Sequence, residues 1–148
     1  MRNLTVIGLA IASSVVLAGC GGGSSALKGG ELKQSLEAPT ESSDYVMARG
    51  IGAADPALPT MAQRKQTSRN AARNDALYQL VGKIKGFQVE GGITVEKAME
   101  TDSKITASVN NLLQGAEEVS CEWDKEDGCI MLMRLPKKIV EKNLGVKF

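Results

Sequence analysis

The chain has 148 residues, enough for one compact domain with some length left for tails. It contains no histidine, so the commonest general base and the commonest metal ligand are both missing. The formal net charge is +1, and because Arg2 is the only charged residue before Cys20, the rest of the chain carries equal numbers of acidic and basic residues. A neutral body lacks the strongly basic face that nucleic-acid binding requires, so we expect no nucleic-acid partner.

Residues 1–19 have the composition of a cleavable signal peptide. Arg2 is followed by an apolar run over 4–17, which is too short to span a bilayer but typical of a signal peptide. The run ends in Leu-Ala-Gly-Cys, which resembles the lipobox of bacterial lipoproteins; an ordinary signal peptide beside a chance cysteine is the alternative. The resemblance implies cleavage between Gly19 and Cys20, a lipid on the Cys20 thiol, and an outer-membrane address, because glycine rather than aspartate follows the cysteine.

The segment after the signal peptide is rich in glycine and serine. Residues 20–43 therefore predict a flexible tether, which we favour over a short helix across 31–36. A single domain is expected over 44–148.

The domain opens with a strand and a long helix. Alternation predicts a strand from Tyr45, on which Gly50 and Gly52 share one face; glycine there indicates close packing against another element, or a bulge. Thr60 is a suitable N-cap for a helix over 61–86, whose apolar residues form one alanine-rich stripe. The stripe indicates a helix that packs closely on a sheet.

Four basic side chains lie mainly away from that stripe. A solvated helix face is the interpretation we favour, and a binding surface for phosphate or for peptidoglycan carboxylates is the alternative. The four residues are Arg64, Lys65, Arg69 and Arg73.

The middle of the domain is ambiguous. Alternation over 87–95, interrupted by two glycines, predicts one bent strand or two short ones. The spacing of Ile105, Val109 and Leu112 predicts a helix over 97–115, with a loop and a shorter helix as the alternative.

The C-terminal end has the clearest pattern. Val119, Cys121 and Trp123 alternate with polar residues and predict a half-buried strand, a turn follows, and the run CIMLMRLP predicts a second strand. Pro136 then starts a short helix that ends at Gly145.

The hairpin register decides whether its two cysteines can pair. A turn over 125–128 sets Lys125 opposite Cys129 and Cys121 opposite Met133, and places the apolar side chains on one face. In this register the two cysteines lie about 13 Å apart, beyond the reach of a disulfide. We therefore favour no disulfide between Cys121 and Cys129, although a register slipped by two pairs would permit one.

The sequence offers no catalytic constellation. Neither Cys121 nor Cys129 belongs to a Cys-x-x-Cys motif, and the carboxylates cluster at a turn and a strand edge, where solvation is the ordinary role. We interpret Met131 and Met133 as core residues rather than as a copper site. We expect no enzyme, no metal site and no cofactor apart from the covalent lipid on Cys20.

Taken in order, several segments resemble the LPP-twenty family of small outer-membrane lipoproteins. They are ARGIGAAD, AARNDALYQLVGKIKG, LQGAEEVSCEW and MLMRLPKKIVE, and the resemblance covers about 45–148 in addition to the lipid signal. Size and layout are most similar to the flagellar members of the family. The resemblance implies an α+β fold of the dodecin or SHS type, with a long helix packed on a small, mainly antiparallel sheet.

The resemblance also implies a function in assembly. Flagellar members form rings or disks around the basal body and support motility, so the expected partners are further copies of the chain and the flagellar outer-ring proteins. The alternative is a general envelope lipoprotein that binds peptidoglycan or another envelope protein. In either case we expect a lipid-anchored protein on the periplasmic side of the outer membrane.

Overall fold

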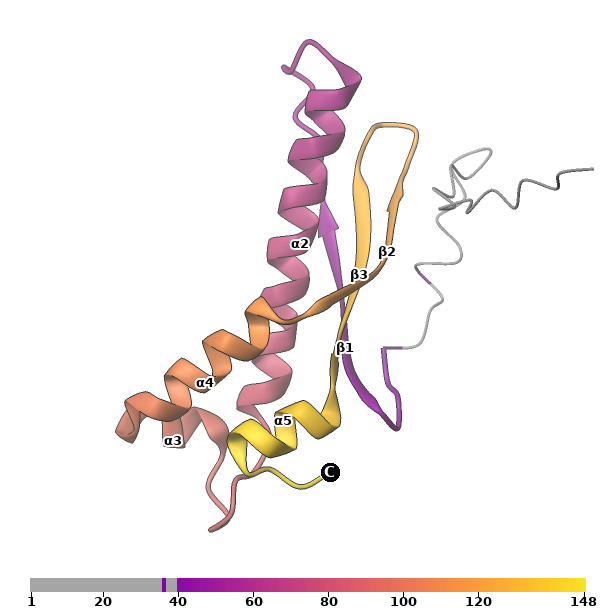
Figure 1. Ribbon diagram of the computed structural model, residues 1–148. Coiled ribbons are helices and arrows are strands. Elements are labelled where there is room, and N and C mark those ends of the chain that lie inside the picture. Colours follow the sequence, from indigo (N-terminus) through magenta and orange to yellow (C-terminus); the bar gives the residue numbers. More distant parts are fainter. Residues whose placement is uncertain (1–35, 37–39) are drawn as a thin grey trace, which may run out of the picture.

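A computed structural model describes residue 36 and residues 40–148 of the chain (Figure 1). The expected signal peptide, Cys20 and most of the expected tether lie outside these residues. The described part has the α+β fold that the sequence predicts. Its elements are β1 (Tyr45–Gly52), α2 (Met61–Lys85), α3 (Val95–Thr101), α4 (Ser103–Gln114), β2 (Glu117–Trp123), β3 (Cys129–Pro136) and α5 (Lys137–Leu144).

The three strands form one antiparallel sheet in the order β1-β3-β2. Helix α2 runs along one face of the sheet, and α3, α4 and α5 gather near the end of α2 (Figure 1). The turn between β2 and β3 lies toward the other end, where α2 begins. The core between α2 and the sheet includes Ala72, Ala76, Leu80, Ile84, Met131, Met133 and Leu135.

Local sequence explains where α2 begins. The Thr60 hydroxyl accepts a hydrogen bond from the Gln63 backbone N–H, and the Gln63 side chain accepts one from the Thr60 N–H. This reciprocal pair satisfies two of the donors that a helix start leaves without partners, so the predicted cap at Thr60 is confirmed.

The two glycines of β1 allow α2 to touch the strand. A Cβ atom on Gly50 would overlap the Ala72 carbonyl oxygen and the Ala76 backbone nitrogen, and one on Gly52 would overlap the Ser68 carbonyl oxygen. The predicted close approach is therefore confirmed, and the alanine stripe of α2 supplies the other half of the contact.

The structure between α2 and β2 differs from the strand or strands predicted over 87–95 and from the helix predicted over 97–115. The segment around Gly91 and Gly92 is a loop with isolated bridges, including one between Gln88 and Thr94, and both glycines have positive φ. The predicted single helix is two helices, because Asp102 ends α3 and caps α4 by accepting a bond from the Lys104 N–H at 2.8 Å.

The register of the hairpin differs from the predicted one by two residues along β3. Cys121 lies opposite Met131 rather than Met133, and Cys129 lies opposite Trp123. Because a shift of two preserves the face to which each side chain points, the buried side of β3 is still the predicted one. Met131 and Met133 are buried in the core, as expected.

Asp124 accounts for this register. Its carboxylate Oδ1 accepts bonds from the backbone N–H groups of Glu126 and Gly128 at 2.9 and 2.7 Å, which draws the turn one residue toward the N-terminus. The left-handed position of the turn then falls on Asp127, with φ 63°, instead of on Gly128. Aspartate tolerates this conformation better than most residues.

A bulge in β2 changes which of its residues face the core. The register shifts between Glu118 and Ser120, so Val119 is 44% exposed, whereas the alternation predicted it on the buried face of the strand. A bulge leaves one residue unpaired and increases the local twist of the strand.

Candidate functional site

The start of α2 is joined to the β2–β3 hairpin by polar contacts. Arg64 Nε lies 2.8 Å from Asp127 Oδ2, and Arg64 Nη1 donates to the Leu58 carbonyl at 3.1 Å. The indole N–H of Trp123 donates to the Lys65 carbonyl at 3.2 Å. We call this set of contacts, together with the Arg69–Glu118 pair, the hairpin seam.

The hairpin seam divides the basic cluster predicted from the sequence. Arg69 Nη2 lies 2.8 Å from Glu118 Oε2, and Lys65 Nζ lies 5.7 Å from the centre of the Trp123 ring. Arg64 is paired with Asp127. Three members of the cluster therefore contact the hairpin, so the predicted solvated face holds mainly for Arg73.

A hollow of about 500 Å³, with both polar and apolar lining, lies beside Arg73, between α2 and the end of α4. Its amide and guanidinium groups can donate hydrogen bonds to carbonyl or carboxylate oxygens of a ligand. It is lined by Asn70, Arg73, Asn74, Leu77, Leu113 and Gln114.

The two hairpin cysteines lie in contact. Both are free thiols, Cys129 is buried and Cys121 is half-buried, and their Sγ atoms are 3.2 Å apart. The predicted separation of about 13 Å is therefore wrong, because it followed from the wrong register. The sequence contained the signal that would have corrected it, an aspartate four residues before Gly128.

The surroundings raise the pKa of both thiols. Burial raises the pKa of the Cys121 thiol, while the nearby Arg69 guanidinium opposes that rise. Burial also raises the pKa of the Cys129 thiol, and the neighbouring Cys121 adds to this effect. Cys121 is thus the more accessible of the two thiols, and the Arg69 guanidinium acts on the pKa of both.

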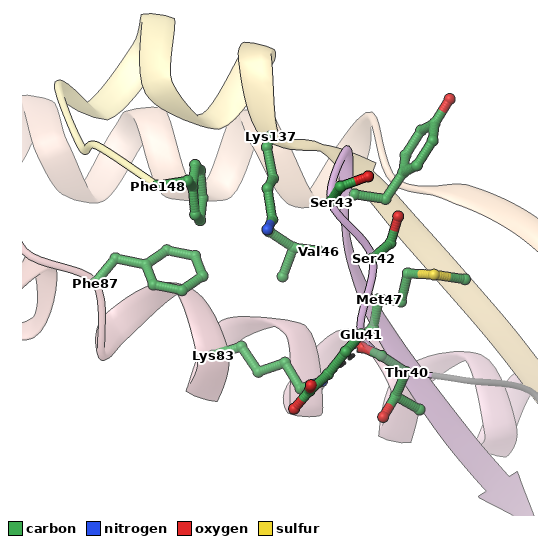
Figure 2. A pocket seen from close by; sticks show the side chains of 11 residues that line it. Thr40, Glu41, Ser42, Ser43, Val46, Met47, Lys83, Phe87, Lys137 and Phe148 are labelled. Atoms are coloured by element: carbon green, nitrogen blue, oxygen red, sulfur yellow. Dashed lines mark hydrogen bonds between the residues drawn. The ribbon is translucent and has the colours of Figure 1, made fainter.

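A larger cleft, of about 610 Å³, lies where the chain enters the domain (Figure 2). The segment 40–43 and the start of β1 form one wall, and side chains from the end of α2 and from the C-terminal segment form the other. The rings of Phe87 and Phe148 meet edge to face, with centres 4.7 Å apart, and Lys137 Nζ lies 4.9 Å from the centre of the Phe148 ring.

Lys83 closes one side of this entry cleft. Its ammonium group donates to the carbonyl oxygens of Thr40 at 3.2 Å and Met47 at 2.8 Å (Figure 2). The Lys137 backbone N–H donates to the Asp44 carbonyl at 2.8 Å. The cleft therefore combines aromatic surface with cations.

Within 40–148, no three cysteine or carboxylate side chains come together in a way that could hold a metal ion. No helix in this part combines the length and apolar character needed to cross a membrane. Gly19 and Cys20, the expected cleavage and lipidation site, lie outside the described residues.

Comparison of the chain with family models, with curated proteins and with solved structures finds no match.

Proposed function

We propose that the chain is a lipid-anchored structural protein of the outer membrane, similar to the FlgP-type flagellar lipoproteins, and that it forms part of a ring or disk at the flagellar basal body. The observation that carries the proposal is the N-terminal order of Arg2, an apolar run and Leu-Ala-Gly-Cys ending at Cys20. Several acyl chains on one residue anchor a protein far more firmly than a single chain does.

The entry of the chain into the domain suits an anchored protein. A pull on the tether would reach the domain at Thr40 and Asp44, whose carbonyls accept bonds from Lys83 and Lys137. These two lysines belong to α2 and α5, so the load would be shared between elements that are distant in the sequence. A domain that must hold its place on a membrane benefits from such an attachment.

One edge of the sheet, along β2, supports lateral association of copies, whereas the other edge, along β1, is closed. The outer edge of β1 is closed by α2, because Asp75 accepts a bond from the Ile51 N–H at 2.9 Å and Lys83 donates to the Met47 carbonyl. Among residues 40–148, β2 pairs with β3 alone, and its Val119 is exposed. An exposed edge strand is a ready site for pairing with another chain.

Removal of the gene tests this proposal. Cells that lack the chain should swim poorly and show motors without the outer disk in tomograms. A gene copy encoding the wild-type chain should restore both, a Cys20→Ser copy should not, and a Cys121→Ser copy serves as the matched control that keeps the anchor. Normal swimming with an intact motor in the deletion strain would contradict the proposal.

A general envelope lipoprotein that binds peptidoglycan is the second candidate. The hollow beside Arg73 favours it, because the amides and the guanidinium group in its lining suit the carboxylates and amides of the cell wall. Sedimentation of the chain with purified sacculi measures this binding. Arg73→Glu should abolish it, whereas Lys104→Glu, the same charge change at an exposed position of α4, should not. Equal loss in both variants, or no binding at all, would contradict this function.

A further inference from the structure

We propose that Cys121 and Cys129 are a site of covalent modification: they form an intrachain disulfide when the chain meets a disulfide-bearing oxidant such as oxidised glutathione. The bond would join β2 to β3 next to the hairpin turn. This inference goes beyond the proposed function, and it does not depend on where the chain is located.

The distance between the two sulfur atoms carries the proposal. The Sγ atoms lie 3.2 Å apart, whereas a disulfide needs about 2 Å, so bond formation has to close a gap of only about 1 Å. The two cysteines are diagonal neighbours across the strands, since Cys121 lies opposite Met131 and Cys129 lies opposite Trp123. Diagonal side chains are ordinarily farther apart than directly opposite ones.

The neighbouring bulge accounts for the close approach. The register shift between Glu118 and Ser120 ends one residue before Cys121, and bulges increase the local right-handed twist. When one strand rotates against the other, one pair of diagonal side chains moves closer together and the other pair moves farther apart. The bulge therefore explains why this diagonal pair lies in contact.

Contacts around the thiols hold both strands in this arrangement. Trp123, directly opposite Cys129, is bonded through its indole N–H to the Lys65 carbonyl, and Asp127 of the turn is paired with Arg64. The hairpin is thus fixed to α2 on the turn side of the thiol pair, and the Arg69–Glu118 pair fixes β2 to α2 on the other side. Two thiols that are held in contact react with each other more readily than with a thiol of a second protein chain.

The two thiols have different roles in the reaction. Cys121, half-buried and near Arg69, attacks the oxidant as a thiolate, forms a mixed disulfide and displaces one glutathione thiolate. The Cys129 thiolate then attacks Cys121 Sγ, forms the intrachain bond and displaces the second glutathione. The two thiols lose two electrons in total, the oxidant gains them, and the two thiol protons end on the released glutathione molecules.

Peptide mapping tests the bond in the full chain. The chain is purified reduced, treated with oxidised glutathione, and digested with trypsin without reductant; cleavage after Lys125 separates the two cysteines into fragments 105–125 and 126–134. The proposal predicts that these two fragments are recovered joined and that they separate on reduction. Two unlinked fragments, or links through Cys20 or between two chains, would overturn it.

The order of reaction is tested with single-thiol variants. In a Cys20→Ser background, Cys129→Ser leaves Cys121 as the only thiol, and Cys121→Ser leaves Cys129. The first variant should form the mixed disulfide at least about tenfold faster than the second, because burial keeps Cys129 from the oxidant. Equal rates, or faster reaction at Cys129, would overturn the assigned roles. Failure of either test leaves the lipid anchor unaffected, since neither depends on Cys20.

Discussion

Helix α2 is held to the sheet by two contacts of opposite character. At β1 the contact has no spare room, because Gly50 and Gly52 bring the strand backbone against the backbone of α2. At the hairpin seam the contact consists of long side chains, with Arg64 reaching Asp127 and Arg69 reaching Glu118. A contact between backbones cannot absorb added volume, whereas long polar side chains can readjust. The two contacts should therefore respond very differently to substitution.

The largest effect is expected at the backbone contact. Gly50→Ala places a Cβ atom onto the Ala72 carbonyl and within 2.8 Å of the Ala76 Cβ, so α2 must move away from the sheet. We expect a loss of at least about 3 kcal/mol in the free energy of unfolding, or failure to fold. Urea unfolding monitored by circular dichroism measures it.

The matched control for this substitution is Gly82→Ala. Gly82 lies inside α2, and nothing lies within 4 Å of the position its Cβ would take. Alanine is favoured over glycine in a helix interior, so the control should gain about 1 kcal/mol. Equal changes in the free energy of unfolding for the two substitutions would contradict the claim that the contact between β1 and α2 cannot absorb added volume.

The next largest effect is expected from a disulfide within the β2–β3 hairpin. Closing the loop between Cys121 and Cys129 with a disulfide should raise the free energy of unfolding by about 2.5 kcal/mol, mainly by restricting the unfolded chain. Thermal unfolding of the oxidised chain with and without dithiothreitol measures the gain. The Cys129→Ser chain should show no response to the reductant; a response there would assign the effect to another bond.

Two substitutions of Asp127, with smaller effects, distinguish the contribution of the turn conformation from that of the ion pair. Asp127→Ala removes the charge that pairs with Arg64 and also places alanine at φ 63°, so we expect a loss of about 2 kcal/mol. Asp127→Asn removes the charge but keeps a residue that tolerates this conformation, so its loss should be about 1 kcal/mol. Urea midpoints of the two variants provide the comparison. A larger loss for asparagine than for alanine would contradict the account of the turn.

The smallest effect is expected where α2 begins. Thr60→Ala removes the hydroxyl that accepts from the Gln63 N–H, and it should lower the free energy of unfolding by about 1 kcal/mol. Thr67→Ala, farther along the exposed side of α2, removes a hydroxyl that bonds only a carbonyl within the helix and should be nearly neutral. Chemical unfolding of both variants measures the difference, and equal losses would argue against the cap.

The sequence predicted those features that depend on near neighbours. Thr60 and Gly145 mark helix ends. The two glycines of β1 and the alanine stripe of α2 predicted the close contact between these two elements. Each of these features is set within a few residues or by one repeated pattern, so a single pass along the chain can find it.

Features set by competing local choices were harder to predict. Asp124 and Gly128 both offer a way to build the turn, and the carboxylate of Asp124 decides it; the register and the cysteine contact follow from that choice. The partners of Arg64 and Arg69 lie more than 45 residues away along the chain, so no local pattern indicates them. The fold class could thus be predicted, but the hairpin seam and the thiol pair could not.

The central functional claim is that Cys20 is the membrane anchor of this domain. Metabolic labelling of cells with radioactive palmitate, followed by recovery of the chain, tests it most directly. We predict label in the wild-type chain and in the Cys121→Ser control, recovery of both with the outer membrane, and no label in Cys20→Ser. Label that persists in the Cys20→Ser chain, or an unlabelled wild-type chain, would contradict the claim.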